Sequence, residues 1–273
     1  MHICTTCGTQ YPPAERPPER CPICEDERQY VGLQGQRWIT LEALSKTHRN
    51  TLYQEGQGIW GIGTEPKFAI GQRALLIQTP AGNLLWDCIS LLDPDTVALV
   101  KALGGISAIA ISHPHYYSSM VEWSQAFGGI PIHLHSADRK WIMRGDPAVA
   151  LWQGETKELA PGITLICAGG HYPGGTVLHW AAGAGGKGAL LSGDIVQVVQ
   201  DGTASFMWSF PNFIPLSAPR VEGVVKSLKP YAFDRVHGAF TDRTIWSDGK
   251  SVVERSAERY LKIIRGDGTY ELQ

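Results

Sequence analysis

Residues 106–115, Ile-Ser-Ala-Ile-Ala-Ile-Ser-His-Pro-His, are the stretch that decides the fold. Ile106–Ile111 is a short apolar run rich in β-branched residues, which predicts a buried strand. That strand runs directly into His113-Pro114-His115. Loops at strand ends are where a rigid sheet can hold side chains around one point, so two imidazoles are expected there.

The elements around this stretch alternate between strands and helices. Arg73–Gln78 and Asn83–Trp86 predict a β-hairpin, and Asp93-Pro94 predicts a helix start that ends at Gly104-Gly105. Further predicted strands are Ile130–Leu134, Ile163–Cys167, Thr176–Trp180, Ala189–Ser192 and Phe233–Val236. Further predicted helices are Ser118–Phe127, one capped by Ser136, one starting at Pro219, and Lys250–Ile264. Hairpins followed by β-α-β units indicate a sheet-rich α/β domain.

Three more potential metal ligands lie where predicted strands end. His171 sits in the glycine-rich loop of residues 169–175, Asp194 follows Gly193, and His237 follows Phe233–Val236. A single histidine is more often a hydrogen-bonded structural residue than a ligand. Five candidates in strand-end loops, in this order, favour a shared metal site.

This pattern resembles that of the metallo-β-lactamase fold, over about residues 55–265. The family pattern is His-x-His-x-Asp-His, a Gly-His loop, Gly-Asp and a final histidine. The matching residues are His113, His115, His171, Asp194 and His237, and Leu84–Asp87 resembles the family's second hairpin strand. The resemblance implies an α/β fold, a four-layer αββα sandwich with the site at one edge of the two sheets.

The chain departs from that pattern where dinuclear members bind a second metal. Tyr117 and Ser118 stand in place of Asp-His, so one metal ion is expected. The resemblance then implies a zinc-bound hydroxide that attacks an ester, lactone, thioester or amide carbonyl of a small substrate. Asp194 would be the fourth ligand or the base that orients the water, and Tyr117 could hydrogen-bond the oxyanion.

Two other functions remain open. His113, His171 and Asp194 could form the facial triad of a mononuclear iron dioxygenase of the same fold. The chain could also be a non-catalytic binding module. Ser205–Pro215, with four aromatics and two prolines, is either a substrate-selecting lid that uses Trp208 and Phe210 or a packing segment. Tyr116 is either a substrate contact or a packing residue.

The first residues form a different kind of segment. Cys4-x2-Cys7 and Cys21-x2-Cys24 place four thiolates for one tetrahedral metal ion, and resemble a rubredoxin-like zinc ribbon. Residues 1–32 have few aliphatic residues, so a structural zinc ion is expected to stabilise them, with redox iron as the alternative. We place the boundary to the main domain, residues 33–273, at this point.

Composition excludes several classes of protein. With 24 basic and 26 acidic residues the net charge is −2, so no nucleic-acid-binding face is expected. No run approaches the ~18 apolar residues of a membrane span, and no secretory signal opens the chain. The expectation is a cytoplasmic protein that acts on a small molecule, with homodimer formation left open. Cys88 and Cys167 are expected to be core thiols.

Overall fold

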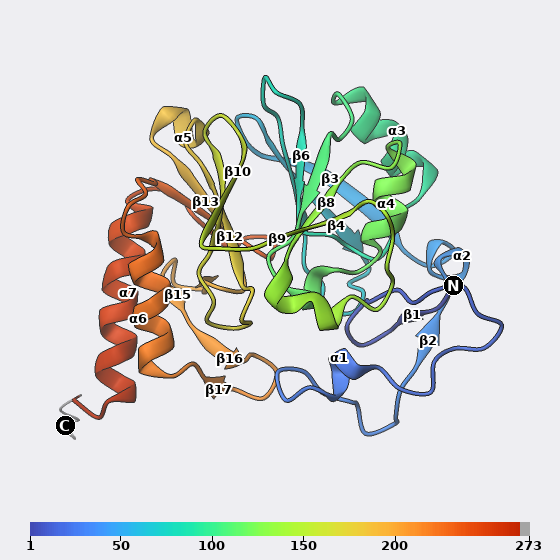
Figure 1. The fold of residues 1–273 in the computed structure, drawn as a ribbon, viewed down its shortest axis with the longest axis horizontal. Coiled ribbons are helices and arrows are strands. Elements are labelled where there is room, and N and C mark those ends of the chain that lie inside the picture. The colour runs from blue at the N-terminus through green and yellow to red at the C-terminus, as the bar shows by residue number, and fades with distance from the viewer. Residues whose placement is uncertain (268–273) are drawn as a thin grey trace. The chain divides into compact units, whose positions relative to one another are not determined.

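The structure, a computed structural model, describes residues 1–267, which form two compact units that divide between Gln153 and Gly154. Each unit is built around one main β-sheet (Figure 1). The residues predicted to carry chemistry are divided between the two units. The units are therefore described one after the other.

The first unit contains a seven-stranded sheet in the order β3-β4-β5-β6-β7-β8-β9. Its strands are antiparallel from β3 to β6 and parallel from β6 to β9. The strands are β3 (Arg49–Gly56), β4 (Ile59–Glu65), β5 (Ala74–Ile77), β6 (Leu84–Trp86), β7 (Ala108–Ala110), β8 (Ile132–His135) and β9 (Val149–Trp152). Helix α3 (Pro94–Ala102) connects β6 to β7, and α4 (Met120–Ala126) lies between β7 and β8.

The sequence signals in this unit act as expected. Strands β5 and β6 form the predicted hairpin, with Leu75 opposite Trp86. The Asp93 side chain caps α3 by accepting a hydrogen bond from the backbone N–H of Thr96. Strand β7 is buried and shorter than the predicted run, and it leads through Ile111 to the histidines. The β3–β4 hairpin was not predicted, because glycines interrupt its pattern and leave little periodic signal.

The four-cysteine segment, residues 1–25, belongs to the first unit. It contains β1 (Ile3–Cys4) and α1 (Pro22–Glu25). Strand β1 pairs with β2 (Trp38–Ile39), which lies beyond the predicted boundary at residue 32 and precedes α2 (Leu41–Ser45). The pairing ties the segment to the chain that follows it, and the boundary itself stays a prediction.

The second unit contains a six-stranded sheet in the order β10-β11-β12-β13-β18-β19. Its strands are β10 (Thr156–Ala160), β11 (Ile163–Cys167), β12 (Thr176–Trp180), β13 (Ala189–Gly193), β18 (Arg235–Gly238) and β19 (Thr244–Ile245). The short helix α5 is Gly183–Gly186. Strand β14 (Gln197–Val198) pairs with β15 (Ala204–Ser205), and β16 (Met207–Ser209) pairs with β17 (Ile214–Pro215).

Helices α6 (Ala218–Leu228) and α7 (Gly249–Ile264) pack side by side in this unit (Figure 1). Their buried valines Val221, Val224 and Val253 share one apolar core with Leu190 and Val236 of the sheet. Burial of these side chains stabilises the sheet from which the candidate ligands of this unit extend. No helix in residues 1–267 combines the length and apolar character needed to cross a membrane.

Three local predictions need correction. The helix expected after Ser136 is the 3-10 turn η2 (Ser136–Trp141), and its cap is His135, whose ring accepts from the Ala137 N–H. Strand β18 begins two residues later than predicted, because parallel pairing sets Ala189 opposite Arg235. Cys167 is only part-buried, so it is not a core thiol.

Candidate metal centres

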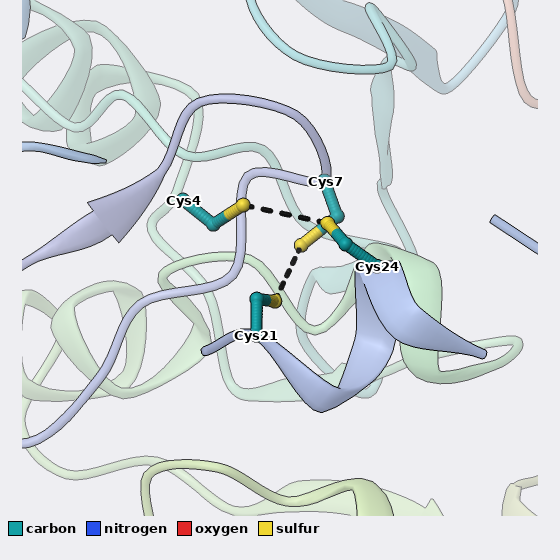
Figure 2. Close-up of side chains that lie close together, drawn as sticks. All are labelled: Cys4, Cys7, Cys21 and Cys24. Atoms are coloured by element: carbon teal, nitrogen blue, oxygen red, sulfur yellow. Dashed lines mark hydrogen bonds between the residues drawn. The ribbon is translucent and has the colours of Figure 1, made fainter. Parts of the chain in front are cut away.

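The four predicted cysteines come together in one cluster within the first unit. Figure 2 shows their sulfur atoms turned toward a common centre, with two sulfurs from each C-x2-C pair. The Sγ atoms of Cys4 and Cys24 are 3.5 Å apart, and those of Cys7 and Cys21 are 3.6 Å apart. A tetrahedral zinc ion with Zn–S bonds of about 2.3 Å holds its sulfurs about 3.8 Å apart. The cluster therefore has nearly the size of a four-thiolate metal site.

The chemistry around the cluster also fits a cation. The Tyr11 hydroxyl donates to Cys21 Sγ at 3.1 Å, and the Gln36 side-chain amide donates to Cys4 Sγ at 3.0 Å. Hydrogen bonds from Cys24, Cys4 and Cys7 lower the pKa of Cys21, whereas burial raises the pKa of Cys7. The thiolate form is thus favoured at Cys21 and disfavoured at Cys7. A bound cation would stabilise the thiolate form of Cys7 as well, since thiolates are the form that binds metal.

The first unit also carries the first histidine pair. His113 lies directly before the 3-10 turn η1 (Pro114–Tyr116), which contains His115, and the two buried rings have centroids 5.0 Å apart. Ser112 Oγ is 2.9 Å from His113 Nδ1. Because Nδ1 is engaged by this hydroxyl, Nε2 is the ring nitrogen that His113 would present to a metal.

Asp87, at the end of β6, fixes the start of this loop. Its N–H donates to the Ala110 carbonyl at 2.9 Å, and its Oδ1 accepts from the Ser112 N–H at 2.7 Å. Asp87 has a φ of 60°, a left-handed conformation that aspartate and asparagine tolerate better than most residues. The aspartate that the resemblance placed at this strand end therefore positions the backbone next to His113.

The second unit supplies the other candidate ligands. His171 lies in the loop between β11 and β12, and its Nδ1 donates to the Met207 carbonyl at 3.1 Å. A carbonyl can only accept, so His171 carries its proton on Nδ1 and its lone pair on Nε2. Asp194 follows β13 directly, and both side chains are buried. This is the tautomer that a histidine ligand adopts when a carbonyl orients it.

Within residues 1–267, a second group of side chains that could hold a metal ion consists of His113, His115, His171 and Asp194. His237 is not a member of this group. It lies within β18, buried, with its ring centroid 6.1 Å from that of Trp246. Its role as a ligand stays a prediction.

The predicted substrate contacts lie in two different settings. Tyr116 and Tyr117 are both buried, and the Tyr116 ring packs against His113 at 4.4 Å. In the second unit, Phe210 lies 5.6 Å from the His171 ring, and Trp208 packs under the guanidinium of Arg220 at 4.7 Å. Phe210 of the aromatic segment thus contacts a candidate ligand, and this contact fits both a substrate-selecting and a packing role.

Two positioning groups were not predicted. The Ser112 hydroxyl gave only a weak signal, as a polar residue between a buried strand and a histidine. The Met207 carbonyl gave none, because a backbone acceptor is the same at every residue. Both become visible only when the chain is folded.

Solved structures with the same fold were found among metallo-β-lactamases. The structure of VMB-1 is 14% identical, with a TM-score of 0.60, over 79% of this chain and 98% of that one. DIM-1 metallo-β-lactamase is 12% identical, with a TM-score of 0.59, over 81% and 99%. A metallo-β-lactamase of Cronobacter sakazakii with a HARLDQ motif is 17% identical, with a TM-score of 0.52, over 79% and 93%. The chain has the metallo-β-lactamase fold, as its histidine pattern predicts.

Comparison with a relative shows the family to which the chain belongs. The chain is 46% identical, over 269 residues and 97% of each protein, to the uncharacterized protein YmaE of Bacillus subtilis (strain 168). The chain belongs to the YmaE family. No protein-family model matches it.

Proposed function

We propose that the chain is a metal-dependent hydrolase with one catalytic zinc ion and one structural zinc ion. The structural ion would be held by the four cysteines. The ligands of the catalytic ion would be His113, His115, His171 and Asp194, with His237 as a further candidate. The substrate would be a small molecule with an ester, lactone, thioester or amide carbonyl.

The tautomer of His171 is the observation that carries this proposal. The hydrogen bond from Nδ1 to the Met207 carbonyl leaves the lone pair on Nε2. The hydroxyl of Ser112 also engages Nδ1 of His113, at 2.9 Å, so Nε2 is the ring nitrogen left for a metal ion. Histidines whose second nitrogen is engaged in this way are typical of metal ligands.

Each group then has an assigned task. A zinc ion with imidazole ligands lowers the pKa of a bound water to about 7 and polarises a carbonyl oxygen. Asp194 would serve either as the fourth ligand of the ion or, as a carboxylate beside it, as the base that orients the attacking water and takes its proton. The Tyr117 hydroxyl donates a hydrogen bond to the oxygen that gains negative charge. Phe210 and Trp208 supply apolar surface to the substrate and exclude water.

Metal analysis combined with a hydrolase assay tests the proposal. Wild type is expected to contain two zinc equivalents and to hydrolyse members of a panel of nitrophenyl esters, lactones and thioesters. His113→Ala should retain one equivalent and lose about a thousandfold or more in kcat/KM, since metal activation of water is lost. Cys4→Ser should lose the zinc equivalent of the cysteine cluster. The control His48→Ala, at a half-buried histidine outside both groups, should match wild type in zinc content and activity.

Three results would contradict the proposal. Iron with oxygen consumption would indicate the dioxygenase chemistry instead. A folded wild-type protein with no metal beyond the cysteine ion would indicate a binding module. Equal activity of wild type and His113→Ala would place the reaction elsewhere.

A further inference from the structure

The four-cysteine segment is hydrogen-bonded to the loop that carries the first two histidines. The N–H of Gln10 donates to the carbonyl of Ser118 at 3.1 Å. Ser118 lies three residues after His115, between η1 and α4. Part of the conformation of the histidine loop is thus fixed by the segment around the cysteines.

A second attachment lies beside the first. The carbonyl of Gly8, within the first cysteine knuckle, accepts from Ser90 Oγ at 2.8 Å, and Ser119 Oγ donates to the Ser90 carbonyl at 2.7 Å. The fit at Gly8 is tight, because a Cβ there would lie 2.5 Å from Ser90 Oγ. Ser90 and Ser119 are buried, so these bonds are shielded from water.

A third attachment reaches the helix that follows the loop. The Gln10 side-chain amide donates to Glu122 Oε1 of α4 at 3.3 Å. Arg144 donates to both of these side chains, to Gln10 Oε1 and to Glu122 Oε1 at 2.7 Å. Gln10 therefore connects the cysteine segment both to Ser118, just before α4, and to Glu122 within α4.

Ser118 also occupies the place of the histidine that binds a second metal in dinuclear members of the resembled family. Its φ is 42°, and its hydroxyl accepts from the Gln72 side-chain amide at 3.0 Å. That amide also donates to the Cys88 carbonyl at 2.9 Å. Side-chain hydrogen bonds from Gln72 therefore hold this turn.

From these contacts, and on the basis of the proposed function, we propose that the four-cysteine segment is a positioning element for the histidine loop. Metal held by the cysteines fixes Gly8 and Gln10. These residues fix the turn at Ser118 and Ser119, and the turn fixes how His113 and His115 are presented. The coupling is reciprocal, so metal bound by the histidines would also tighten the cysteine segment.

A variant that weakens the attachment without touching either ligand set tests this proposal, although the backbone hydrogen bond from Gln10 to Ser118 remains in it. Ser90→Ala with Gln10→Ala removes two of the side chains that join the segment to the loop. Arg20→Ala is the matched control, because it removes an exposed ion pair with Glu25 in the same segment. Each holoprotein is measured by hydrogen–deuterium exchange of residues 112–120 and by chelator competition for zinc.

We expect the double variant to keep the zinc ion of the cysteines and to show faster exchange in residues 112–120. Its zinc affinity at the histidines should fall about fivefold to tenfold, the usual size of a coupling between two sites. The control should match wild type in both measurements. Cys21→Ser, which removes the cysteine ion itself, should show the same changes with a larger amplitude.

Unchanged exchange in residues 112–120 of both the double variant and Cys21→Ser would overturn the proposal. If wild type binds no metal at the histidines, the proposed function fails, and the exchange measurement still decides whether the segment positions the loop. If Cys21→Ser does not fold, the double variant, which retains all four cysteines, decides alone.

Discussion

The two candidate metal centres are built in opposite ways. The cysteine cluster is complete within residues 4–24 of one unit, in two short knuckles. The members of the second group are spread along the chain from His113 to Asp194, in separate loops. A centre of the first kind depends on local chain geometry, whereas a centre of the second kind depends on how an entire fold is assembled.

The groups that orient the ligands lie at similar distances along the chain in the two centres. The Tyr11 hydroxyl, 10 residues from Cys21, and the Gln36 side-chain amide, 32 residues from Cys4, donate to cysteine sulfurs. The Met207 carbonyl, 36 residues from His171, accepts from the His171 ring. The two centres therefore differ in the spacing of their ligands and not in the reach of the groups that orient them.

Lowering the pH should release the metal ion completely from each centre, in two transitions that variants can assign to one centre or the other. Burial raises the pKa of Cys7, so this thiol is protonated at neutral pH in the metal-free segment. Metal binding must therefore release protons, and the affinity and the stability that it confers fall as the pH falls. His113→Ala, which keeps only the cysteine ion, should lose it in one steep acid transition. A chromophoric chelator measures the release.

Wild type should show an additional acid transition, because neutral imidazoles are the ligands of the second centre and protons compete with the metal ion for their ring nitrogens. Cys4→Ser should retain that transition alone. Metal release that does not depend on pH in His113→Ala would contradict the assignment of thiolate ligands.

Removal of the Asp87 carboxylate should weaken the histidine centre and leave the cysteine centre intact. Asp87→Ala leaves the buried Ser112 N–H without its acceptor and places alanine at a φ of 60°. We expect zinc affinity at the histidines to fall about tenfold to a hundredfold, as for other groups that support ligands. Asp87→Asn keeps an acceptor oxygen and should be much closer to wild type. Equal losses in both variants would show that the charge matters and the hydrogen bond does not.

The smallest expected effect concerns Tyr117. Tyr117→Phe removes the hydroxyl and keeps the buried ring, so both metal ions should remain bound. We expect kcat to fall about tenfold with KM nearly unchanged, less than the about hundredfold cost of removing a dedicated oxyanion donor. Steady-state kinetics on the best substrate of the panel measures this. A changed KM with the same kcat would indicate that Tyr117 contacts the substrate in its ground state.

Much of the fold could be predicted because its signals are local. The apolar strand before His113, the hairpin around residues 79–82 and the Asp93 cap all appear in the structure. The predicted start of the strand β18 was wrong, because the strand begins where it pairs with β13 and not where its own apolar residues begin. The β3–β4 hairpin was missed for want of a periodic pattern.

The sequence by itself determined the cysteine cluster and the identity of the candidate ligands, because C-x2-C spacing and strand-end placement are properties of short stretches of chain. Only the tertiary structure decided the tautomer of His171, the anchoring of Ser112 by Asp87 and the attachment of Gln10 to Ser118. Two of these contacts depend on a backbone carbonyl as acceptor, which every residue carries. Their positions follow from folding, since no side chain in the sequence marks them.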